Sequence, residues 1–289
     1  MLYDALIAPF AEFAFMRRAL VGAIALALSG APIGVFLMLR RMSLTGDAMA
    51  HAILPGAAVG YLFAGLSLGA MTIGGLAAGL TVAVLAGVVS RATALREDAT
   101  MAAFYLISLA LGVAIVSAKG SNIDLLHVLF GSVLALDDDA LILLAAISSV
   151  TLGALALLYR PLVLECVDPG FLRTVSRAGP VAHLSFLGLV VLNLVAGFHA
   201  LGTLLAVGVM MVPAATARLW SADITAMIIV ATLTGIASSI GGLLVSYHVG
   251  LPAGPAIILF AGAFYVASLI VGPAGGMIST LVPRRHLEA

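Results

Sequence analysis

Charged residues are scarce in this sequence. Asp, Glu, Lys and Arg make up 9% of the 289 residues, against about 25% in a typical soluble domain. Hydrophobic residues reach 63%, and the formal net charge is zero. A soluble chain of this length could not bury so much apolar surface, whereas a lipid bilayer can act as its solvent. The composition therefore favours a membrane protein, and the charge gives no reason to expect a nucleic-acid partner.

Several functional motifs are also absent. The chain has one cysteine, Cys166, so it can form no internal disulfide. It contains no GxxxxGK[ST] phosphate-binding loop, so any ATP-driven activity needs a separate ATPase. It also lacks the HExxH motif of metalloproteases. The sequence therefore predicts a protein that is not an enzyme.

Long apolar runs predict an all-α, polytopic membrane protein. A run of about 20 apolar residues is long enough to cross the hydrocarbon core as a helix. No ten-residue alternation of polar and apolar residues suggests a membrane barrel. No linker divides the chain, so we expect one transmembrane domain over 1–289. Nine spans are predicted, or eight if one neighbouring pair forms a broken helix, at 17–39, 47–65, 68–90, 99–118, 140–159, 180–198, 200–219, 224–247 and 254–275.

The basic residues predict the orientation of these spans. With the N-terminus outside the cytoplasm, ten of the thirteen basic residues fall on the cytoplasmic side, as the positive-inside bias requires. Only Arg17, Arg18 and Lys119 then fall outside. Small residues at four-residue spacing, GAAVG at 56–60 and GLAAG at 75–79, predict close helix packing within the chain or between subunits.

Asp47 and His51 stand four positions apart in LTGDAMAHAILPG, directly before an apolar stretch. On a helix they share one face and could hold a common cation. A carboxylate with an imidazole suits borderline divalent metals such as zinc or manganese. The alternative is a helix cap at Asp47 and a packed histidine at His51. Pro55 and Gly56 are expected to interrupt the helix, as in the broken helices where transporters bind substrates.

The longest polar stretch is RPLVLECVDPGFLRTVSRAGP at 160–180. Pro169 can open a short helix and Gly179 can close it. On the cytoplasmic side such a helix would suit docking of a partner, and the alternative is an ordinary interfacial helix. His183 lies beside this loop, where we expect a structural role.

Four blocks of the sequence resemble the permease subunits of ABC-type zinc, manganese and iron importers. They are LRRMSLTGDAMAHAILPGAAVGYL at 39–62, LGTLLAVGVMMVPAATARL at 201–219, GLPAGPAIIL at 250–259 and VDPGFLRTVSRAG at 167–179. The resemblance implies a homodimeric permease in a bacterial inner membrane. It also implies a cytoplasmic ATPase partner and a periplasmic metal-binding protein.

The resemblance also implies roles for individual residues. Asp47 and His51 would lie in the translocation path, and no cofactor would be bound permanently. Where the family has Ser before this His, the chain has Ala50, which removes one hydroxyl that could hydrogen-bond the imidazole. Histidine favours zinc as the cargo, with manganese or iron as the alternative. The residues expected to contact the ATPase are Asp168, Arg173, Arg177 and Gly179.

Two other functions remain open at this point. A proton-coupled secondary transporter could use Asp47 and His51 as a proton relay. A purely structural membrane subunit would need neither residue, and so leaves the first block unexplained.

Overall fold

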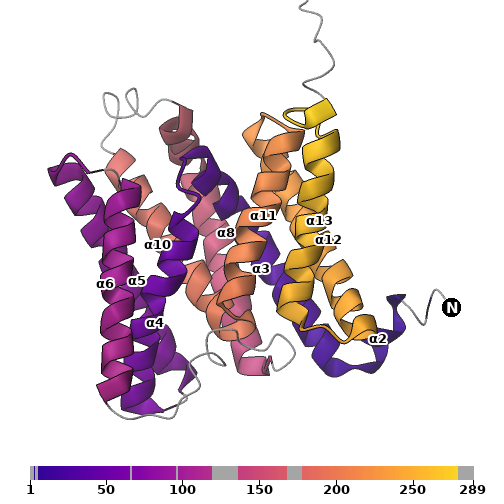
Figure 1. Ribbon diagram of the computed structural model, residues 1–289, viewed down its shortest axis with the longest axis horizontal. Coiled ribbons are helices and arrows are strands. Elements are labelled where there is room, and N and C mark those ends of the chain that lie inside the picture. Colours follow the sequence, from indigo (N-terminus) through magenta and orange to yellow (C-terminus); the bar gives the residue numbers. More distant parts are fainter. Residues whose placement is uncertain are drawn as a thin grey trace, which may run out of the picture.

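The computed structural model describes residues 3, 6–65, 67–95, 97–118, 136–167 and 178–278, which contain helices and no strand. The long helices pack side by side in one bundle, and successive helices run in opposite directions along it (Figure 1). In chain order they are α2 (Ala8–Glu12), α3 (Ala14–Leu39), α4 (Thr45–Ala64), α5 (Leu68–Ala92), α6 (Glu97–Ala118), α8 (Asp138–Val167), α10 (Ala178–Leu201), α11 (Thr203–Trp220), α12 (Ile224–Val249) and α13 (Ala253–Val271).

The nine predicted spans each correspond to one long helix among the described residues. Among the described residues α10 and α11 are two separate helices, with Gly202, at a φ of 89°, between them. Eight of the nine helices are long and apolar enough to cross a membrane. The exception is α4, since Asp47 and His51 lower the mean hydropathy of its first two turns.

Basic side chains gather at one end of the bundle. Arg40 and Arg41 follow α3, and Arg218 lies in the last turn of α11. The carboxyl ends of α3, α8 and α11 lie together at the top of Figure 1. We call this the basic end. Arg18, near the start of α3, lies at the opposite end, where it pairs with Asp138 at 2.8 Å.

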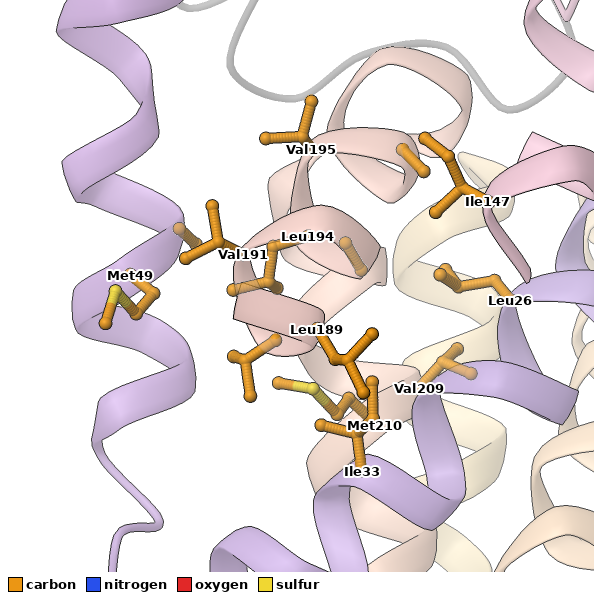
Figure 2. Packing of buried hydrophobic residues seen from close by; sticks show 14 of the residues in the cluster. Leu26, Ile33, Met49, Ile147, Leu189, Val191, Leu194, Val195, Val209 and Met210 are labelled. Carbon is orange, nitrogen blue, oxygen red and sulfur yellow. The ribbon is translucent and has the colours of Figure 1, made fainter. Parts of the chain in front are cut away.

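The core is built around α3 and α10. Ser29 of α3 shares a 3.1 Å hydrogen bond with Ser148 of α8, and both are buried. Such polar contacts join helices inside an apolar bundle, where water offers no alternative partner. Figure 2 shows Met49 of α4 across from Val191 of α10, within one continuous hydrophobic cluster. The buried face of α4 is thereby anchored to the centre of the bundle.

The two small-residue motifs lie at contacts within the chain. Gly56 of α4 faces Gly74 of α5 so closely that a Cβ on either would overlap the other's carbonyl. A Cβ on Gly75 would meet Cγ2 of Ile53 at 2.8 Å, and one on Gly79 would meet Cγ1 of Val191 at 2.6 Å. The glycines therefore let α5 pack tightly against α4 and α10, as the spacing predicts.

The expected interruption at Pro55 is wrong, because α4 continues as a helix through it to Ala64. Proline lacks the N–H that would bond to the carbonyl of His51, four residues earlier. The neighbouring helix compensates in part, since the Ser108 hydroxyl donates to the carbonyl of Ala52 at 3.2 Å. Ser and Thr side chains on neighbouring helices support proline-containing membrane helices in this way.

Candidate functional site

A tight turn places the start of α4. The Met42 N–H donates to the Leu37 carbonyl at 2.9 Å, and the Arg41 N–H donates to the Met38 carbonyl at 3.0 Å. These two bonds form a Schellman motif, whose left-handed position is normally a glycine. Here it is Arg41, with a φ of 58°, the one non-glycine residue with a positive φ in the described part of the chain. The sequence therefore keeps a strained turn directly before the candidate site.

Asp47 and His51 lie on one face of α4, as their spacing predicts. Oδ1 of Asp47 is 3.7 Å from Nε2 of His51. Asp47 is in the first turn but is not the N-cap, which is Leu44 and makes no side-chain cap. The side chain of Asp47 is 63% exposed in the single chain, and that of His51 is 33% exposed. Neither residue therefore fits the alternative of a cap and a packed core histidine.

The pair lies near the middle of the bundle. A Cβ on Gly46 would meet Cε of Met210 at 2.7 Å, and Met210 is halfway along α11. His51 stacks on Tyr105, which lies well inside α6, with ring centroids 6.1 Å apart and an interplanar angle of 29°. The turn after α3 therefore lets α4 begin beside the middle of α11, which places an ionisable pair deep among apolar helices.

One stripe of α4 is left open along much of its length. Asp47 is exposed, and His51, Leu54, Ala58 and Tyr61 are half-buried, at helical spacing. The intervening residues of the first three turns are largely buried against α5, α6 and α10. An ionisable pair facing lipid at this depth would cost several kcal/mol, about 2.5–3.5 for a centred charge on insertion scales. The open stripe therefore needs water or another protein surface against it.

A small cavity adjoins Asp47 on the side of α6. Its volume is about 150 Å³, and its polar lining comes from Thr45, Asp47, Asp98 and Tyr105. Sequence reasoning missed Asp98, because it precedes the predicted span at 99–118 and has no motif around it. Only the packing of α4 against α6 brings this second carboxylate to the same cavity as Asp47.

The described residues contain no group of three or more His, Cys, Asp and Glu side chains that could hold a metal ion. Asp47 and His51 could therefore offer at most two ligands from one chain. A four-coordinate or six-coordinate ion would need water or a second copy of the chain to complete its ligands.

The predicted contacts with an ATPase are only partly described. Asp168, Arg173 and Arg177 lie outside the described residues. Gly179 is buried near the start of α10, at the basic end. The polar stretch at 160–180 begins inside α8 and ends inside α10, so helices flank it on both sides.

Comparison with known proteins identifies the class to which this helical membrane bundle belongs. The model of the ABC 3 transport family matches residues 12–272, so the chain belongs to this family. It is a multi-pass permease of the ABC type, as the four blocks predict.

Individual relatives match along nearly the full chain. The manganese import system permease protein ScaB of Streptococcus parasanguinis is 31% identical over 262 residues, 91% of this chain and 92% of the relative. A probable iron transport system membrane protein of Haemophilus influenzae is 31% identical over 268 residues, 93% of this chain and 97% of the relative. These relatives are named for manganese and iron, so the expectation of zinc gains no support from them.

A solved structure shares the fold. The structure titled PsaBC from Streptococcus pneumoniae in complex with Fab matches with a TM-score of 0.84 and 28% sequence identity. The match covers 98% of this chain and 100% of that chain.

Proposed function

We propose that the protein is the permease subunit of an ATP-driven importer for manganese(II) or iron(II), with Asp47 and His51 in the translocation path. The observation that carries this proposal is their position. Oδ1 of Asp47 and Nε2 of His51 are 3.7 Å apart on the open stripe of α4, about halfway along the bundle. The names of the relatives support a transition metal as cargo.

The donors around the pair favour manganese over zinc. Besides the His51 imidazole, the nearby donors are oxygens: the Asp47 and Asp98 carboxylates and the Thr45 hydroxyl. Oxygen donors suit manganese(II) better than they suit zinc, which prefers nitrogen and sulfur. Asp47 and Asp98 line the same cavity between α4 and α6. In this proposal the ion passes through that cavity from Asp47 to Asp98 on its way to the basic end.

The exposure of the site supports a homodimer. Asp47 is 63% exposed in the single chain, which is costly if that face meets lipid. A second copy packed against the open stripe would bring two Asp47–His51 pairs to a shared, water-containing path. Four protein ligands would then be available, and water would complete the shell weakly enough for release.

Transport would follow alternating access in a bacterial inner membrane. A periplasmic metal-binding protein would deliver the ion to the end opposite the basic end. ATP binding by a cytoplasmic ATPase would act on the segment at 160–180, with Asp168, Arg173, Arg177 and Gly179 as its contacts. The shift between outward-open and inward-open states would then pass the ion from the Asp47–His51 pairs toward Asp98.

Metal uptake tests the proposal directly. Metal-starved cells carrying the permease, its ATPase and its binding protein are given manganese, iron or zinc, and cell metal is counted by elemental analysis. We expect ATP-dependent manganese or iron uptake that is lost in Asp47→Ala/His51→Ala at normal membrane abundance. Asp139→Ala/His248→Ala is the matched control, because it removes the same residue types from the start of α8 and the end of α12, away from the Asp47–His51 pair.

Other outcomes select other functions. Zinc uptake alone would restore zinc as the cargo while keeping the class. Uptake that survives removal of the ATPase but collapses with the proton gradient would indicate a secondary transporter. Wild-type uptake in the double variant would remove Asp47 and His51 from the path.

A further inference from the structure

A buried ionic cluster lies near the basic end, away from the Asp47–His51 pair. Nη2 of Arg40 donates to Oε1 of Glu165 at 3.1 Å and also contacts Nδ1 of His183. The Arg40 side chain is 9% exposed and its guanidinium lies over the Phe186 ring, 5.2 Å from the centroid. The three polar residues come from three elements: the end of α3, the end of α8 and the start of α10.

Two buried polar atoms of the cluster lack a hydrogen-bond partner in the part of the chain that the structure describes. Nη1 of Arg40 and Oε2 of Glu165 are buried and have no hydrogen-bond partner among the described residues. A buried ion pair is stabilising only when its remaining donors and acceptors are also bonded, and otherwise an apolar pair of similar volume does as well or better. Unsatisfied buried groups in a native protein call for an explanation. A second arrangement of the same three helix ends, in which both atoms are bonded, is such an explanation.

The position of the cluster connects two functional parts of the proposed transporter. Glu165 and His183 stand on the two helices that flank the polar stretch at 160–180. Arg40 directly precedes the Schellman turn at Arg41, which places α4 and therefore Asp47. Two backbone hydrogen bonds close that turn, so Arg40 and the start of α4 belong to one local structure.

We propose that Arg40 is a positioning residue for transport, which links the ends of α8 and α10 to the start of α4 through Glu165 and His183. This inference rests on the proposed function. It adds a residue that couples the segment contacted by the ATPase to the segment that carries Asp47. In one transport state the cluster has the arrangement described here. In the other, the helix ends move relative to one another and Arg40 pairs with both oxygens of Glu165.

The decisive variant is Arg40→Met/Glu165→Met, reconstituted in proteoliposomes with the ATPase and the binding protein. A merely structural ion pair can be replaced by apolar residues without loss of stability. We expect this variant to fold with wild-type thermal stability and to keep its ATP hydrolysis. The manganese moved per ATP hydrolysed should fall clearly below the wild-type ratio, because hydrolysis continues while its link to the start of α4 is lost.

Two further variants keep the test decisive. Glu165→Gln preserves the volume of the side chain and one hydrogen bond to Arg40. Its ratio of manganese moved to ATP hydrolysed should also fall, which tests the linkage if the double variant fails to fold. Arg18→Gln removes an arginine from an ion pair at the opposite end, with Asp138, and should leave the ratio unchanged. A wild-type ratio in both Arg40→Met/Glu165→Met and Glu165→Gln would overturn the linkage. Absence of metal uptake in the wild-type complex would instead overturn the proposed function, and the linkage with it.

Discussion

The imidazole of His51 stacks on the ring of Tyr105, with centroids 6.1 Å apart and planes 29° apart. His51 is on α4 and Tyr105 is on α6, so one side chain of the candidate pair is held by a different helix from the one that carries it. The orientation of the imidazole therefore depends on the packing of α6 as well as on the helical spacing within α4.

Loss of the Tyr105 ring should weaken metal binding without abolishing transport. Aromatic pairs contribute about 0.5–1.5 kcal/mol beyond their buried area. Tyr105→Ala should therefore raise the metal concentration for half-maximal uptake by roughly 2-fold to 10-fold. Tyr105→Phe keeps the stack and should stay close to wild type. The measurement is uptake over a range of metal concentrations, and equal shifts in the two variants would assign the effect to the hydroxyl instead.

The approach of α4 to α5 should tolerate no side chain at Gly74. A Cβ there would overlap the Gly56 carbonyl, and overpacking of this kind costs about 1–3 kcal/mol. Gly74→Ala should lower the thermal unfolding midpoint in detergent. Gly87→Ala on the same helix is the control, because a Cβ at Gly87 meets nothing within 4 Å. If Gly87→Ala lowers the unfolding midpoint as much as Gly74→Ala does, the flexibility of glycine in α5, and not the close approach to α4, would explain the loss.

The residue before His51, Ala50, should not govern the orientation of the imidazole. Ala50 is 4% exposed and lies on the buried face of α4, about 100° around the helix from His51. A hydroxyl introduced there would bond back to the carbonyl of Gly46. Ala50→Ser should thus leave metal uptake within about twofold of wild type, with at most about 1 kcal/mol of lost stability. A large gain in metal affinity would instead place the hydroxyl beside the imidazole.

The helices and the shared face of Asp47 and His51 could be predicted from the sequence, because each depends on residues within one segment. Nine apolar runs become nine helices, and residues four apart on a helix share a face. Pro55 misled the prediction, because its effect depends on Ser108 of another helix. Asp98 and the Arg40–Glu165–His183 cluster could not be predicted, since they form only when helices distant in sequence come together. Neither has a local motif.

The left-handed backbone of Arg41, with a φ of 58°, should lower the stability of the turn before α4. A residue with a Cβ in the left-handed region costs about 1 kcal/mol relative to the right-handed one, and glycine has no such cost. Arg41→Gly should therefore raise the thermal unfolding midpoint above that of Arg41→Ala, which removes the same charge but keeps the Cβ. The comparison of the two variants, rather than of either with wild type, isolates the backbone term. If Arg41→Ala is as stable as Arg41→Gly, the turn is not strained. Arg41→Gly can also be more stable than Arg41→Ala and yet transport more slowly. That result would show that the strained residue keeps the start of α4 rigid, because glycine loosens the turn that positions Asp47.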